Sequence, residues 1–201
     1  MLAALSLPSP ANAAFDGTVI PIPPNIRERM VSWHPGCPVP IRRLRLLKFN
    51  HWDFQDDERR GRLIIQQAEA PKVLGVMRTL YRAHFRMKKI WLIDAYGGSD
   101  DRSMAADNTS AFNCRFVAGT SRWSEHAYGK AIDINPVENP YVSGNHVSPA
   151  AGRRYADRSL RARGMIHAGD KVVRAFRSIG WSWGGYWSGP KDYQHFSASG
   201  N

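Results

Sequence analysis

The chain has 201 residues, of which 43% are hydrophobic, 11% aromatic and 22% charged. This length predicts one domain that can bury a core without needing a metal or disulfides merely to fold, and this composition excludes the fibrous and disordered classes. The chain has 28 Lys and Arg against 17 Asp and Glu, and the resulting net charge of +11 favours either a polyanionic partner or simply a solvated basic surface.

The first residues resemble an export signal. A short apolar stretch ends in Ala11-Asn12-Ala13, which suits the small-residue rule for signal cleavage, although no basic segment precedes it. We therefore expect residues 1–13 to be a truncated signal segment. Since no later stretch approaches the ~20 apolar residues of a membrane span, the sequence predicts a secreted protein that does not span the membrane.

Residues 14–61 are rich in proline and predict an extended lead-in that packs on the domain. Cys37, in this lead-in, and Cys114 form an even pair, and an exported chain is expected to oxidise them to a disulfide. Closing so long a loop could add roughly 4 kcal/mol of stability in the chain-entropy model. The cysteines are therefore interpreted as structural.

Residues 62–201 are the expected catalytic domain, and hydrophobic periodicity predicts its elements. A helix opens at Pro71 and runs to about Arg86, and a second helix covers residues 171–179 and ends at Gly180. Runs of β-branched and aromatic residues predict strands at 62–66, 90–93, 112–117, 131–134, 181–185 and 194–197. This order favours an α+β fold: a single domain with a small central antiparallel sheet flanked by helices.

The segment from Ser124 to Asp133 carries the clearest chemical signal. In the strand Ala131-Ile-Asp-Ile134, Asp133 lies on the face opposite the isoleucines, where His126 can reach it. Gly129 allows a tight turn between the two groups. A carboxylate on a buried strand is costly unless something charged receives it, and a divalent cation does so well.

A second imidazole and a second carboxylate occur near the C-terminus, at His195 and Asp192. Two histidines and one carboxylate with an open fourth position make a catalytic zinc arrangement, in which the remaining carboxylate, Asp192, takes the proton of the attacking water. Taken only as spacing, His-x6-Asp and Asp-x2-His are loose patterns. The other five histidines are interpreted as structural or solvated.

Two blocks together carry a more specific signal: Ser124-x-His126-x-x-Gly129-x-Ala131-x-Asp133, and Gly180-Trp-x-Trp-Gly-Gly185 followed by Asp192-x-x-His195-Phe. They resemble the VanY-type zinc D-alanyl-D-alanine carboxypeptidases, of the superfamily shared with lysostaphin-type peptidases and the hedgehog N-terminal domain. The resemblance spans roughly residues 62–197. It implies a hedgehog/DD-peptidase-like fold, zinc on His126, Asp133 and His195, Asp192 as catalytic base, and Ser124 as a second-shell or substrate-contacting hydroxyl.

Such families also use an arginine to hold a substrate carbonyl or carboxylate, a task that suits its planar fork. Arg115, just ahead of the metal motif, is favoured for this role, and Arg102 is the alternative. Trp187 is the expected aromatic contact. Trp181 and Trp183 fit either a ligand groove or the core.

Together with these residues, the resemblance implies a secreted, cell-wall-associated zinc metallopeptidase that hydrolyses peptidoglycan stem peptides, as a carboxypeptidase or an endopeptidase. An anionic cell-wall polymer would explain the basic surface, and a monomer is the default expectation. A non-catalytic zinc module that binds the wall or a protein partner is the alternative, although a retained Asp192 argues against it. A nucleic-acid-binding function rests only on charge, because no zinc-finger spacing, aromatic RNP run or basic heptad helix is present.

Overall fold

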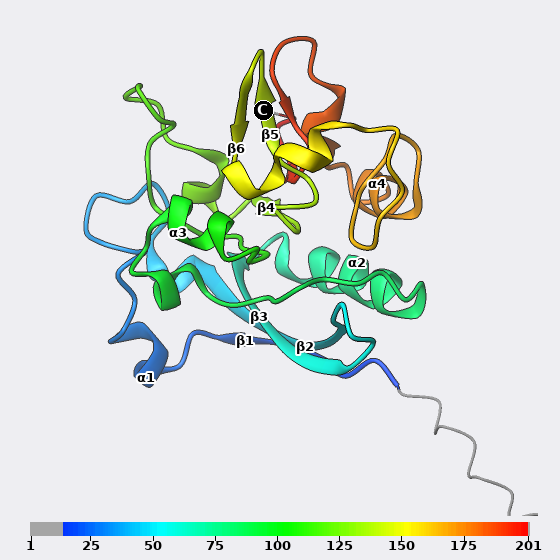
Figure 1. The fold of residues 1–201 in the computed structure, drawn as a ribbon. Helices are drawn as coiled ribbons and strands as arrows, with labels where there is room; N and C mark the ends of the chain where they lie inside the picture. Colours follow the sequence, from blue (N-terminus) through cyan, green and yellow to red (C-terminus); the bar gives the residue numbers. More distant parts are fainter. Residues whose placement is uncertain (1–13, 201) are drawn as a thin grey trace, which may run out of the picture.

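The computed structural model describes residues 14–200, and the signal segment predicted at residues 1–13 lies outside that range. The described chain is a single α+β domain of short helices and small antiparallel sheets (Figure 1). The α+β class is therefore confirmed. The expected single central sheet is corrected to three sheets of three strands each among these residues, ordered β1-β2-β3, β4-β9-β7 and β6-β5-β8.

The strands have these bounds: β1 Gly17–Pro21, β2 Leu44–Trp52, β3 Glu58–Gln66, β4 Ala131–Asp133, β5 Tyr141–Ser143, β6 His146–Ser148, β7 Ser182–Trp183, β8 Lys191–Asp192 and β9 His195–Ser197. The α-helices are α1 Pro24–Arg27, α2 Ala70–Arg82, α3 Asp100–Ala105 and α4 Lys171–Arg177. Short 3-10 helices cover Ile41–Arg43, Ile93–Tyr96, Glu125–Tyr128, Ala150–Ala156 and Gly184–Tyr186.

The largest sheet begins in the expected lead-in. β2 pairs with β1 on one side and over nine residue pairs with β3 on the other, from Leu44 opposite Gln66 to Trp52 opposite Glu58. The expected domain boundary between residues 61 and 62 falls inside β3. Residues 14–61 thus share a sheet with the segment that follows them, so they are part of the domain's framework.

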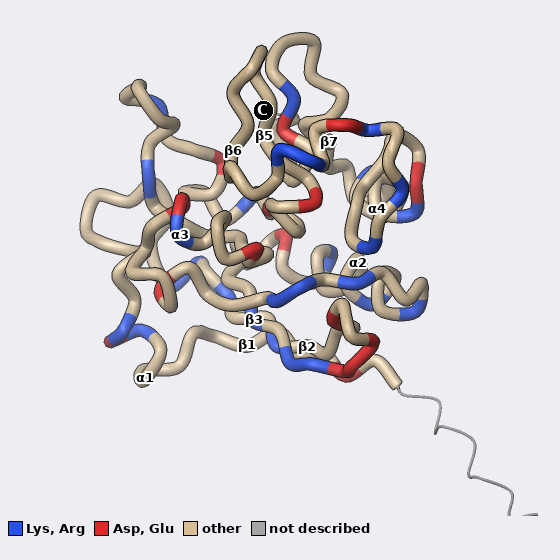
Figure 2. The backbone as a smooth tube through the Cα atoms, in the orientation of Figure 1, with Lys and Arg blue, Asp and Glu red and all other residues tan. Residues whose placement is uncertain are grey.

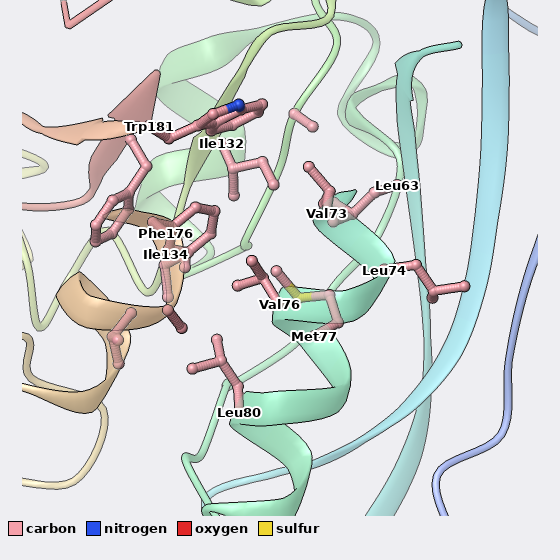
Figure 3. Close-up of a cluster of buried hydrophobic side chains, with 14 of the residues drawn as sticks. Leu63, Val73, Leu74, Val76, Met77, Leu80, Ile132, Ile134, Phe176 and Trp181 are labelled. Atoms are coloured by element: carbon pink, nitrogen blue, oxygen red, sulfur yellow. The ribbon is translucent and has the colours of Figure 1, made fainter. Parts of the chain in front are cut away.

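The main core lies between this sheet, α2 and the second sheet (Figure 3). Helix α2 buries Val73, Val76, Met77 and Leu80, because these residues recur at the spacing that places side chains on one helical face. Figure 3 shows this face turned toward Phe176 of α4. The predicted helices at 71–86 and 171–179 are confirmed as α2 and α4, each ending a few residues early.

Two predicted strands are wrong. Residues 90–93 make one isolated bridge at Ile90 and then enter a 3-10 helix, and residues 112–117 make one bridge at Phe116. Both runs are apolar because they cover the core: Ile90 and Phe112 are almost fully buried. A short buried apolar run has the same composition whether or not its backbone pairs in a ladder. The acidic, polar segment that follows Gly98 contains α3.

A second, smaller core cluster is closed by the predicted disulfide. Cys37 and Cys114 are joined, with their Cα atoms 5.9 Å apart and 77 residues between them in sequence. The half-cystines pack with Ile22, Val39 and Phe112. The disulfide thereby fixes the lead-in beside the extended segment that contains Arg115.

None of the described helices has the length and apolar character needed to cross a membrane. Lys and Arg residues occur in many segments of the described chain (Figure 2). The basic character therefore does not come from one element.

Candidate active site

Strands β4 and β9 bring Asp133 and His195 together. They pair antiparallel with Asp133 directly opposite His195 and Ile132 opposite Phe196. Residues opposite each other in such a ladder point to the same face, and side chains alternate along each strand. The apolar pair Ile132 and Phe196 therefore enters the core while Asp133 and His195 face the other way.

His126 reaches the same point from the 3-10 helix Glu125–Tyr128. The Ser124 hydroxyl accepts a hydrogen bond from the His126 backbone N–H at 3.3 Å, which caps the start of this helix. Gly129 ends it with φ of +65°, and its carbonyl accepts a hydrogen bond from the backbone N–H of Gln66. A Cβ at Gly129 would lie 2.7 Å from the Gln66 nitrogen, so this turn requires glycine.

The three side chains converge in a buried group. His126 Nε2 lies 3.1 Å from Asp133 Oδ2 and 3.3 Å from His195 Nδ1, and His195 Nδ1 lies 3.0 Å from Asp133 Oδ1. His126 Nδ1–H donates to the Ala111 carbonyl at 2.6 Å. This bond selects the tautomer in which Nε2 carries a lone pair directed at the other two groups.

The donor set fits zinc. Ligands 2.0–2.2 Å from a tetrahedral ion lie roughly 3.3–3.5 Å from one another, close to the separations found here. A lone pair on His126 Nε2 facing an Asp133 oxygen at 3.1 Å is unfavourable unless a cation lies between them. The Ala111 carbonyl supplies the outer-shell acceptor that metal-binding histidines usually have. His126, Asp133 and His195 could therefore hold a metal ion.

The two imidazole rings affect the ionisation of Asp133. Burial alone would raise the pKa of Asp133, but the adjacent His126 and His195 rings hold it well below its usual range. Asp133 is therefore the ionised member of the group. An ionised carboxylate with two imidazoles matches the protonation state that a metal requires of its ligands.

Asp192 lies at the edge of the third sheet, opposite Tyr141 of β5. Burial, with the charge of Asp133 nearby, raises the pKa of Asp192 to about 7. Its Oδ1 is buried and has no hydrogen-bond partner among the described residues. A carboxyl poised near neutrality with a free oxygen can accept a proton from a reacting group.

These residues line one cleft of about 870 Å³. His126, Asp133, Asp192 and His195 are among its polar lining residues. Trp187 lines it with its ring centroid 5.6 Å from that of His195, and Trp123 lines it as well. The cleft is large enough for a peptide of several residues.

The structure separates the two candidate arginines. Arg115 lines the cleft, where it forms an ion pair with Asp100. Arg102 is exposed outside the cleft lining, and its guanidinium donates two hydrogen bonds to the Tyr96 carbonyl. Only Arg115 of the two is therefore placed to contact a ligand in the cleft.

The remaining predicted contacts differ in their positions. Ser124 and Trp187 both line the cleft, although the Ser124 hydroxyl is already used as a helix cap. Trp181 and Trp183 are 3% and 4% exposed in the main core, which decides the question that the sequence left open. They pack against Phe176 and Phe196 on the core side of β9 and do not line the cleft.

Asp100 and Tyr141 were missed by the sequence reasoning although both line the cleft. Asp100 occurs in an acidic polar segment that reads as an ordinary loop, and Tyr141 in a short strand without alternation. The signal that could have found Asp100 is Ser99, a helix-capping residue ahead of two acidic residues, which marks the start of α3.

Comparison with known proteins supports this reading of the site. Residues 118–198 match a family model described as D-alanyl-D-alanine carboxypeptidase. The match covers a segment of less than half of the chain. That segment contains His126, Asp133, Asp192 and His195, and the resemblance found from the sequence is confirmed there. No curated protein and no solved structure matches the chain.

Proposed function

We propose that the protein is a zinc metallopeptidase that hydrolyses peptide bonds in the stem peptides of peptidoglycan. The observation that carries the proposal is the buried group of His126, Asp133 and His195 at the base of a peptide-sized cleft, beside a carboxyl with an unpartnered oxygen. The match to the carboxypeptidase family model supports this choice of substrate class.

In this proposal His126, Asp133 and His195 hold the zinc, with Asp133 as the anionic ligand. Bound zinc would supply Lewis acidity, lowering the pKa of a water molecule and polarising a carbonyl. Asp192 accepts the proton of the attacking water at its free oxygen and passes it to the leaving amine. Arg115 receives an oxygen of the peptide, and Trp187 packs against the substrate's apolar surface.

The environment of Asp192 favours an enzyme over a purely structural zinc module. A structural zinc site closes its four positions with protein ligands, whereas the described residues within reach of one another offer three. A buried acceptor without a partner costs about 1–3 kcal/mol, and such a cost is typical of a group kept for chemistry. Asp192 Oδ1 is an atom of this kind.

The place of action follows from the proposed substrate. Peptidoglycan lies outside the cytoplasm, and the Cys37–Cys114 disulfide suits an oxidising environment. A surface with a net charge of +11 would hold the enzyme near anionic wall polymers. We expect the enzyme to work as a monomer.

The test compares three proteins: wild type, Asp192→Ala and His126→Ala. Each is loaded with zinc, analysed for bound metal, and incubated with purified stem peptides whose products are identified by mass spectrometry. We expect about one zinc and hydrolysis in the wild type, zinc without hydrolysis in Asp192→Ala, and neither in His126→Ala. Full activity of Asp192→Ala would remove this residue from the role of base.

The products also identify the bond. Release of a single terminal D-alanine would show a carboxypeptidase, and cleavage within the stem an endopeptidase. Zinc bound at one equivalent with no cleavage of any stem peptide would instead favour the non-catalytic module.

A further inference from the structure

The guanidinium of Arg115 depends on one close partner. Arg115 Nη2 lies 2.6 Å from Asp100 Oδ2, whereas Nη1 lies 3.4 Å from the Phe116 carbonyl oxygen. The buried Nε–H has no acceptor among residues 14–200. Since a contact of 3.4 Å is weak, Asp100 supplies the only strong polar contact that fixes the end of this side chain within the described structure.

Asp100 is itself held firmly. It is the first residue of α3, whose start is capped by the Ser99 hydroxyl accepting a hydrogen bond from the Arg102 backbone N–H at 3.3 Å. The loop just before α3 is tied by Asn113, whose side-chain amide donates to the Gly98 carbonyl at 3.2 Å. Asn113 lies two residues before Arg115, so its hydrogen bond to Gly98 links the chain near Arg115 to the chain near Asp100.

The pair lies in the wall of the cleft and is partly shielded from water. The side chains of Asp100 and Arg115 are 25% and 30% exposed, and both line the cleft. An arginine side chain loses rotamer entropy when it is fixed. If a partner in the protein fixes it beforehand, substrate binding does not have to meet that cost.

We propose that Asp100 is a positioning residue: it holds the Arg115 guanidinium in the cleft so that the N–H donors it leaves unused receive an oxygen of the peptide substrate. The inference rests on the proposed function, because it gives Arg115 a peptide to bind. It goes beyond that function in assigning a role to α3, which lies outside residues 118–198.

Two measurements test the inference in the zinc-loaded, disulfide-intact protein. The first is a double-mutant cycle on the hydrolysis of a stem peptide, with Asp100→Asn, Arg115→Ala and the combined variant. Because misplacing a substrate-positioning group can cost up to about 100-fold, we expect Asp100→Asn to lower kcat/KM roughly 10- to 100-fold when Arg115 is present. In the Arg115→Ala background we expect less than about a twofold further loss.

The matched control is Asp16→Asn. Asp16 also pairs with an arginine at 2.6 Å, through Arg60 Nη1, but this pair is exposed and does not line the cleft. We expect Asp16→Asn to leave kcat/KM unchanged. An equal loss from Asp100→Asn with and without Arg115 would show that Asp100 matters only to the structure, and would overturn the inference.

The second measurement does not need activity. The ¹⁵N relaxation of the Arg115 Nε–H group reports whether its guanidinium is ordered. We expect a rigid Nε–H in the wild type and in Asp16→Asn, and a mobile one in Asp100→Asn. If the wild type cleaves no stem peptide, the proposed function fails while this measurement still decides whether Asp100 positions Arg115; equal rigidity in Asp100→Asn refutes it.

Discussion

A buried carboxyl pair outside the cleft lining gives a prediction about pH and stability. Glu138 is 6% exposed and shares a hydrogen bond with Asp107, which also accepts the Val137 backbone N–H at 3.0 Å. Burial, together with the charge of Asp107, raises the pKa of Glu138 to about 9. Two adjacent carboxyls in such a place hold one proton between them at neutral pH.

The sign of the pH effect follows from proton binding. In the unfolded chain Glu138 loses its proton near its ordinary value of 4.5, whereas in the folded protein it keeps it to about 9. Its contribution to stability is therefore complete below pH 4.5 and is lost progressively as the pH rises to about 9. The loss is at most ~1.4 kcal/mol per pH unit, so about two units cost up to ~3 kcal/mol.

Glu138→Gln removes this dependence, because the amide is neutral at every pH and can still donate a hydrogen bond to Asp107. We compare the free energy of unfolding of the variant with that of the wild type at two pH values. The difference, variant minus wild type, should be about 1–3 kcal/mol larger at about pH 8 than at about pH 6. Urea unfolding of both proteins at the two pH values measures this difference. A difference that is the same at both values would refute the shared-proton interpretation.

Further predictions concern the core, the disulfide and the site. Phe196→Ala should lower the free energy of unfolding by about 3–5 kcal/mol in urea titrations, since Phe196 is fully buried behind the site. Cys37→Ser should lower it by about 2–5 kcal/mol, and equal midpoints with and without the disulfide would contradict this. Gly129→Ala should weaken zinc binding by at least about tenfold in competition titrations, because its turn positions His126. Hydrolysis should rise as the pH increases toward about 7, since Asp192 must lose its proton to act as base; a falling rate would exclude it.

The sequence predicted best where its pattern was long or chemically distinctive. Helix α2 could be predicted because its apolar residues keep helical spacing over 13 residues. His126, Asp133 and His195 were found because imidazoles and carboxylates at these positions match a two-block pattern, and the structure brings all three together.

The elements that escaped prediction lack such a pattern. β2 was not predicted because charged residues such as Arg45 and Lys48 interrupt its apolar run, and of its partner β3 only residues 62–66 were predicted. β8 has two residues, too few to show any period. The role of Asp100 depends on α3 lying across from Arg115, a tertiary contact that no local pattern encodes.

The cleft has two walls of different origin. The proposed zinc ligands and Asp192 come from residues 118–198, whereas Asp100 and Arg115 come from the chain before that segment, and Arg115 directly follows the disulfide-bonded Cys114. In such an arrangement, the residues proposed for hydrolysis and those proposed to hold the peptide can vary independently. Enzymes that share the first wall could diverge in the bonds they cut by remodelling the second.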